Sequence, residues 1–189
     1  MTNRLSPSFF KKNTLNVAKE LLGTELLYES DDGQVGGIIS ETEAYTEDDP
    51  ACHAFKGKKT PRNAPMFLNG GHIYIYFIYG MYHCLNFVTE KEGVGAAVLI
   101  RELIPTKGLH IIKQHRSKIK NESQLLNGPS KLMIGLNIKT SLNGTYLWHQ
   151  DSPFQLIKRM TPTKIQQLER IGIREGIEKK WRFKAKFDN

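Results

Sequence analysis

Three short runs of strand-forming residues, separated by glycines, constrain the fold of this chain more than any other feature. Residues 72–79, 82–89 and 96–103 are rich in Ile, Val, Tyr and Phe, which favour strands. A Gly-Met pair separates the first two runs, and two glycines lie between the second and the third. Because glycine tolerates the backbone angles of tight turns, each run can reverse onto the one before it. The pattern predicts an antiparallel meander.

The residues before the meander predict a helix and a hairpin. Residues 14–22 carry apolar side chains at helical spacing, and Asn13 or Thr14 can cap the first turn. Residues 26–28 and 34–45 flank an Asp-Asp-Gly turn, which indicates two paired strands.

The residues beyond the meander predict more helix than strand. Residues 106–120 show helical periodicity, and residues 129–136 begin with a proline, which suits a first helical turn. We expect a short strand at 145–148 and a further helix at 162–170. Since the sequence has no repeat, linker or low-complexity tract, all 189 residues should form one mixed α/β (α+β) domain, with a curved, mainly antiparallel sheet and packed helices.

The chain carries a formal charge of +8, with 27 Lys and Arg against 19 Asp and Glu. Such an excess favours a polyanionic partner, with nucleic acid first and an anionic membrane surface second. The longest apolar run, around residues 73–81, is too short to span a bilayer, and residues 1–13 lack the apolar core of a signal peptide. We therefore expect a cytoplasmic protein that binds double-stranded DNA and no membrane.

The predicted strand at 34–45 ends in side chains that can do chemistry. Glu41, Glu43 and Tyr45 alternate along the chain, so they share one face of an extended strand. Acidic groups that face a polyanion weaken binding unless they serve another purpose. This favours a catalytic carboxylate, against the competing interpretation of a solvated strand end.

Cations and tyrosines follow these carboxylates. The Gly- and Pro-containing loop after the strand holds four cations that suit phosphate binding: Lys56, Lys58, Lys59 and Arg62. The next strand places Tyr74 and Tyr76 on one face, where a base can stack. Tyr79 adjoins Gly80 at a turn, from which an aromatic ring can wedge between base steps. A mobile basic loop and half-buried packing tyrosines are the competing interpretations.

The two cysteines give little support to a metal site. Cys52 and Cys84 each adjoin a histidine, yet structural zinc ligands usually come as spaced pairs such as C-x-x-C, and the chain has none. We expect two reduced, half-buried thiols, no metal and no other cofactor.

Several separated segments share their order and residues with a known family. They are residues 41–45 (ETEAY), 51–53 (ACH), 60–63 (TPRN), 66–67 (MF), 74–81 (YIYFIYGM), Asn86, 97–101 (AVLIR) and 127–132 (NGPSKL). Together they resemble the alkyladenine (3-methyladenine) DNA glycosylase family of the Mpg type, from the first helix to about Leu136. The resemblance implies a glycosylase of base excision repair, in which Glu43 activates water and Arg101 helps to hold that water and the carboxylate. Because the lysines near the site lie in a polar loop, where solvation keeps them protonated, we expect a monofunctional enzyme that forms no Schiff base.

The resemblance also implies how a damaged purine is held. Tyr45, His53 and Tyr76 would stack on and hydrogen-bond the flipped base, Tyr79 would fill the gap left in the duplex, and Asn86 would crowd the amino group of normal guanine. Aromatic faces attract an electron-poor alkylated purine through a cation–π interaction. The implied substrates are purines of the 3-methyladenine, hypoxanthine and ethenoadenine type.

Other functions fit the sequence less well. A nucleobase deaminase needs the zinc motifs H-x-E and P-C-x-x-C, which are absent. A sugar glycosidase could pair Glu41 with Glu43, but alternate residues of a strand lie on one side, only about 7 Å apart, and do not flank a sugar ring. A non-enzymatic basic DNA-binding protein remains the main alternative. A single duplex-binding face without a spare apolar stripe predicts a monomer with no obligate protein partner.

Overall fold

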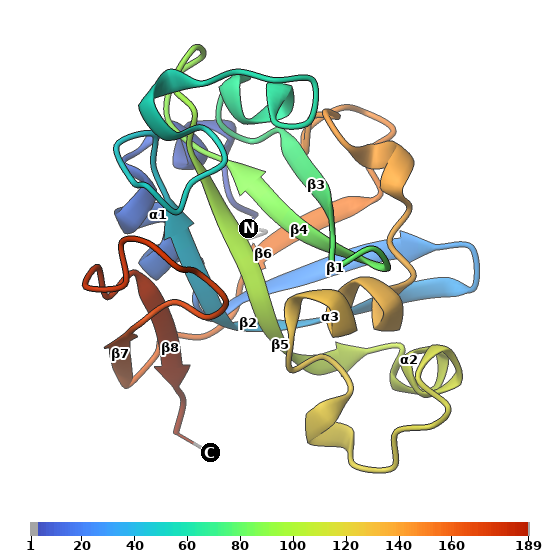
Figure 1. Ribbon diagram of the computed structural model, residues 1–189. Helices are drawn as coiled ribbons and strands as arrows, with labels where there is room; N and C mark the ends of the chain where they lie inside the picture. Colours follow the sequence, from blue (N-terminus) through green and yellow to red (C-terminus); the bar gives the residue numbers. More distant parts are fainter. Residues whose placement is uncertain (1–3, 189) are drawn as a thin grey trace.

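One antiparallel sheet of eight strands forms the frame of the protein, in a computed structural model that describes residues 4–188 (Figure 1). The main order is β3-β4-β5-β2-β1-β6, while β8 pairs with β2 and β7 pairs with β8. The strands are β1 (Thr24–Ser30), β2 (Gly33–Tyr45), β3 (Ile73–Ile78), β4 (Tyr82–Val88), β5 (Ala97–Lys107), β6 (Phe154–Lys158), β7 (Lys164–Leu168) and β8 (Arg182–Lys186). The predicted meander is confirmed as β3, β4 and β5, each antiparallel to the next.

Three α-helices lie against this sheet within residues 4–188: α1 (Thr14–Glu20), α2 (Leu109–His115) and α3 (Pro129–Leu136). The side chain of Asn13 caps α1 by accepting from the backbone N–H groups of Leu15 and Asn16, at 3.1 and 3.4 Å. Pro129 occupies the first turn of α3, where its missing N–H costs no hydrogen bond. The prediction of a single α+β domain with a mainly antiparallel sheet is confirmed. No helix in this described part of the chain has the length and apolarity needed to cross a membrane.

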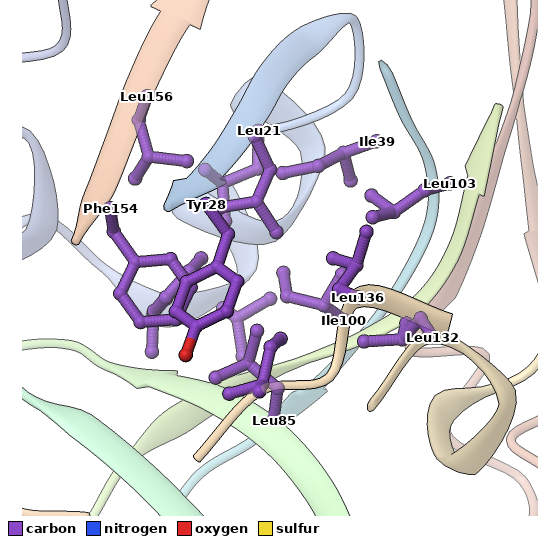
Figure 2. Packing of buried hydrophobic residues seen from close by; sticks show 14 of the residues in the cluster. Leu21, Tyr28, Ile39, Leu85, Ile100, Leu103, Leu132, Leu136, Phe154 and Leu156 are labelled. Carbon is purple, nitrogen blue, oxygen red and sulfur yellow. The ribbon is translucent and has the colours of Figure 1, made fainter. Parts of the chain in front are cut away.

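The core lies between the sheet and the helices (Figure 2). Ile39 of β2 and Ile100 of β5 are fully buried, as is Leu132 of α3. Tyr28 and Phe154, from β1 and β6, pack with their ring centroids 4.9 Å apart. Each such side chain contributes roughly 1.5–3 kcal/mol by leaving water. This packing holds in place the strands that carry the candidate site residues.

The helix predicted at 106–120 is wrong at both ends. The strand expected at 96–103 continues as β5 to Lys107, because the long β2 offers a partner as far as Gly36. Gly108 then adopts a left-handed conformation with φ of 65°, and α2 covers only Leu109–His115. Pairing with β2 has overridden the local helical periodicity.

The predictions for the last fifty residues are also wrong in part. Residues 145–148 form no strand, and only an isolated bridge joins Tyr146 to His72. The helix expected at 162–170 is instead β7, whose mainly exposed residues become a strand by pairing with β8. The sequence analysis did not find β6 or β8.

The second half of β2 has a partner on each edge. β5 pairs with it on one side, and β8 replaces β1 on the other, with Glu41 opposite Lys184 and Glu43 opposite Arg182. Register shifts lie on both sides of Glu41 along the β2–β5 ladder. Glu41 and Glu43 therefore lie in the middle of the sheet, which does not fit the competing interpretation of a solvated strand end.

Candidate active site

A cavity of about 670 Å³ opens beside the end of β2. Strands β3, β4 and β5 supply one wall, and the first turn of α3 and residues 171–175 supply others. The lining includes six residues that the sequence singled out, namely Tyr45, His53, Tyr76, Tyr79, Asn86 and Arg101. The structure thus brings together residues from distant parts of the chain.

Glu43 lies behind the cavity wall and is fully buried. Its Oε2 accepts a hydrogen bond from the Tyr45 hydroxyl at 2.8 Å, and its Oε1 accepts from the backbone N–H of Ile171 at 2.9 Å. The Nη1 of Arg101 lies 3.2 Å from the same Oε1. Three donors converge on a group that accepts only, and two of them, Tyr45 and Arg101, also line the cavity.

Glu41 binds the other side of Arg101. The Nε of Arg101 donates to Oε1 of Glu41 at 3.1 Å, and Arg182 and Lys184 of β8 approach the same carboxylate at 3.1 Å each. Burial opposes the ionisation of Glu41, but hydrogen bonds from Lys184 and Arg182 outweigh it and hold its pKa below the usual value. Burial likewise opposes the charge of Arg101, but Glu43 and Glu41 raise its pKa. Both groups are charged at neutral pH.

Aromatic rings form the apolar part of the wall. The ring of His53 meets that of Tyr76 edge-on with centroids 4.7 Å apart, and its Nδ1 lies 2.9 Å from the Tyr74 hydroxyl. Partial desolvation of the ring, together with the positive charge of Arg62, lowers the pKa of His53 to about 4, although the residue as a whole is exposed. Burial raises the pKa of the phenols of Tyr45 and Tyr76. All these rings are uncharged at neutral pH.

Asn86 and Cys84 lie on β4 beside these rings. The Asn86 amide donates to the carbonyl oxygens of Tyr74 and Cys84 at 3.0 and 3.3 Å, which fixes its orientation. Cys52 and Cys84 are free thiols, buried rather than half-buried as expected, and burial raises the pKa of Cys52 to about 12. Within residues 4–188, no three His, Cys, Asp or Glu side chains are grouped as metal ligands.

Tyr79 stands at the tip of the β3–β4 hairpin. It is 72% exposed, and its φ of 53° is left-handed, a strained conformation for a residue with a Cβ. Gly80 shares the positive φ, at 68°. The turn presents an aromatic side chain at the cavity mouth, as the sequence predicted from the Tyr-Gly pair.

The four predicted phosphate-binding cations do not line the cavity. Lys56, Lys58 and Lys59 are exposed on the loop after β2. Arg62 donates to the carbonyl oxygen of Phe77 at 2.9 Å and lies 5.6 Å from the centroid of the Tyr76 ring. These contacts hold the loop at the rim of the cavity.

A buried ion pair behind Tyr45 escaped the sequence analysis. Arg170 and Asp49 have fully buried side chains, and Nη2 of Arg170 donates to Oδ1 of Asp49 at 2.9 Å. The guanidinium also lies over the ring of Tyr45, 4.7 Å from its centroid. Arg170 thereby anchors the segment whose next residue, Ile171, donates to Glu43.

Other side chains around the site were missed with it. They are Arg182 and Lys184 of β8, and Lys131 and Arg174 in the cavity lining. The local sequence contained no signal for them, because their partners in space lie more than one hundred residues away: the separations are 121 for Arg170 and 141 for Arg182.

The comparisons with known proteins agree with this geometry. The family model for methylpurine-DNA glycosylase (MPG) matches residues 8–189. The chain belongs to the methylpurine-DNA glycosylase family. As a methylpurine-DNA glycosylase, it is a hydrolase of N-glycosyl bonds that acts on DNA in repair.

Individual relatives match this methylpurine-DNA glycosylase over nearly their whole length. A protein from Sodalis glossinidius named "Putative 3-methyladenine DNA glycosylase" is 45% identical to this chain over 182 residues, which cover 96% of each of the two chains. The next two relatives carry the same name. The relative from Carboxydothermus hydrogenoformans is 44% identical, covering 96% of this chain and 95% of its own. The relative from Rhodopseudomonas palustris (strain BisB5) is 43% identical, covering 95% of this chain and 85% of its own.

Proposed function

We propose that this enzyme rotates a damaged purine nucleotide out of double-stranded DNA into the cavity and hydrolyses its N-glycosyl bond. The substrates are alkylated or deaminated purines, including 3-methyladenine, which the names of its relatives mention, and bases of the hypoxanthine and ethenoadenine type. The observation that carries the proposal is the fully buried Glu43, held by three donors directly behind an aromatic cavity. A DNA-binding protein without catalysis has no need of such a carboxylate.

Glu43 acts on the attacking water. It takes a proton from the water as the oxygen bonds to C1′ of the deoxyribose, and the electrons of the C1′–N bond leave with the purine. A purine that carries a positive charge from alkylation departs as a neutral molecule, so a single carboxylate suffices. A neutral base of the hypoxanthine or ethenoadenine type departs as an anion and takes up a proton from solvent. Arg101, fixed against Glu43, keeps the carboxylate oriented toward the reacting centre.

The cavity selects flat, electron-poor bases. Tyr45, Tyr76 and His53 present uncharged faces, which attract a cationic purine without the repulsion that a charged imidazole would cause. The fixed amide of Asn86 crowds the exocyclic amino group of normal guanine. Tyr79 fills the space that the flipped nucleotide vacates in the duplex.

The enzyme leaves an intact abasic site. Strand-cutting glycosylases attack the sugar with an amine, which must lose its proton through burial or neighbouring charge. Lys56, Lys58 and Lys59 are exposed, and the Nζ of Lys131, the lysine that lines the cavity within residues 4–188, donates to Asn127 at 2.7 Å. Reaction in borohydride should therefore trap no protein–DNA adduct, and an adduct lost in Lys131→Ala would overturn this part of the proposal.

The test is base release from a duplex that carries one ethenoadenine or hypoxanthine, scored by alkaline cleavage under single-turnover conditions. Glu43→Gln should lower the rate on the order of a hundred- to ten-thousand-fold, while the duplex is bound nearly as well as by the wild type. Glu25→Gln is the matched control, because it makes the same change at a carboxylate of β1 that contacts Arg159 and lies outside the cavity lining. A Glu43→Gln rate within a few fold of wild type would sink the assignment.

A further inference from the structure

Glu41 is a buried carboxylate that the proposed hydrolysis leaves without a task. Its residue is 6% exposed and does not line the cavity. Arg101, Arg182 and Lys184 all contact it, each at 3.1 Å. Burying a charge is costly unless it is paired. The three cations therefore offset the cost of burying the Glu41 carboxylate within the sheet.

Arg101 connects this cluster to the catalytic carboxylate. Its Nε faces Glu41 while its Nη1 faces Glu43, so one planar guanidinium is fixed between two carboxylates of the same strand. Strand β8 fixes Glu41 in turn, because Lys184 is its register partner and Arg182 pairs with Glu43 in the ladder. The contacts form a continuous path from the C-terminal strand to Glu43.

We propose that Glu41 is a positioning residue: with Arg182 and Lys184 it orients Arg101 and sets how strongly the Arg101 charge acts on Glu43. The inference rests on the proposed role of Glu43 in activating water. It assigns a function in catalysis to β8, which contributes no residue to the lining of the cavity.

A role for Glu41 as a proton donor to the leaving base does not fit this geometry. The carboxylate contacts three cations, all of which favour its ionised form. A general acid must carry a proton at the working pH, and Glu41 does not meet this condition.

The sign of the effect follows from the charges around Glu43. The cation in contact is Arg101, Arg170 lies behind the ring of Tyr45, and the other titratable neighbours, Tyr45, Tyr76 and Cys84, are neutral groups. Removing the negative charge of Glu41 leaves Arg101 to act on Glu43 alone, which favours the ionised form of Glu43. Removing the positive charge of Arg182 leaves more of the Glu41 charge uncompensated, which disfavours the ionised form of Glu43.

The experiment compares single-turnover excision of ethenoadenine as a function of pH in Glu41→Gln and Arg182→Gln. Glu41→Gln should shift the acid limb of the profile to lower pH by roughly half to one unit, and Arg182→Gln should shift it to higher pH. The plateau rate of Glu41→Gln should fall about ten- to a hundredfold, because Arg101 loses one of its two anchors. Affinity for an undamaged duplex should stay within a few fold, and the control Glu25→Gln should move neither limb nor plateau.

Opposite shifts distinguish positioning from damage to the fold, which moves both variants in the same direction. A Glu41→Gln plateau within twofold of wild type, or an equal loss in Glu25→Gln, would overturn the proposal. If Glu41→Gln does not fold, the test rests on the acid limb of the pH–rate profile of Arg182→Gln. An acid limb at the wild-type position would then reject the positioning role. Full activity in Glu43→Gln would instead reject the proposed function itself, so the two failures are separable.

Discussion

Tyr45 combines two tasks that a single substitution can separate. Its ring lines the cavity, and its hydroxyl donates to Glu43 at 2.8 Å. Tyr45→Phe keeps the ring but removes a donor that stabilises the carboxylate, so the acid limb of the pH–rate profile should move to higher pH by about one unit. Tyr45→Leu should in addition weaken binding of an ethenoadenine duplex, while Tyr45→Phe should not. A single-turnover pH profile of the two variants tests this, and an unshifted limb in Tyr45→Phe would contradict the contact.

His53 should make the stability of the protein depend on acid. Its pKa is lowered to about 4 in the folded chain, against roughly 6.5 in an unfolded one, so the unfolded state binds more protons between these values. The corresponding stability is fully present above about pH 6.5 and is lost as the pH falls toward 4. Urea midpoints measured across this window should fall less steeply in His53→Gln than in wild type. His110→Gln, which removes a histidine that does not line the cavity, is the control variant.

For the residues at the end of β2, the sequence indicated which side chains lie together but did not indicate how deeply they are buried. Alternation placed Glu41, Glu43 and Tyr45 on one face, and all three meet Arg101 or each other as that pattern predicts. Their burial was not predictable, because it depends on β8, whose Arg-Phe-Lys-Ala-Lys sequence has few apolar residues. A long-range partner decides whether a carboxylate is solvated, and the local pattern does not contain that information.

At the scale of elements, the β3–β4 hairpin carries strain at its functional tip. Tyr79 holds a left-handed φ of 53°, a conformation that glycine adopts freely. Tyr79→Gly should therefore leave the folding stability equal to wild type or up to about 1 kcal/mol higher, while it loses the ring that fills the duplex. Fluorescence of 2-aminopurine next to the lesion should show a reduced flipped fraction, and the thermal midpoint should not fall. Tyr79→Ala, which loses the ring but keeps the strain, should be the less stable of the two.

The helices and strands with strong local signals were predicted correctly. Those whose secondary structure depends on pairing with a distant strand were not. The Asn13 cap and Pro129 mark the starts of α1 and α3 in the sequence itself. By contrast, β7 has the sequence Lys-Ile-Gln-Gln-Leu and is a strand because β8 lies beside it. The extension of β5 to Lys107 likewise follows from the length of β2. Strand pairings between distant segments are the features that the sequence could not supply.

The net charge of +8 predicts a polyanionic partner for the molecule and does not depend on the fold. The site itself is locally rich in carboxylates, since Glu41, Glu43 and Asp49 are all buried in or behind its walls. Internal ion pairs with Arg101, Arg170 and Arg182 neutralise them. The cations left to attract a polyanion are therefore Lys131 and Arg174 of the cavity lining and the exposed cations around the cavity.

The rim cations should govern the salt dependence of DNA binding. Lys56, Lys58 and Lys59 are exposed on a loop that Asn63 ties to the cavity edge, by donating to the carbonyl oxygens of His53 and Lys58 at 2.6 and 2.8 Å. Each lysine that contacts a phosphate releases about one counterion, so replacing all three with Ala should weaken duplex binding and reduce the slope of log K against log salt by about one per contact.

The control for this experiment removes the same charge elsewhere. Lys107, Lys118 and Lys120 are exposed around α2, at the opposite end of the molecule from residues 46–69 in Figure 1, and none lines the cavity. Replacing these three lowers the net charge equally, which should weaken long-range attraction a little while leaving the slope unchanged, because no phosphate contact is lost. Filter binding or anisotropy over a range of salt concentrations measures both slopes. Equal slopes for the two triple variants would show that net charge alone draws DNA to the protein, and would remove the loop from the binding surface.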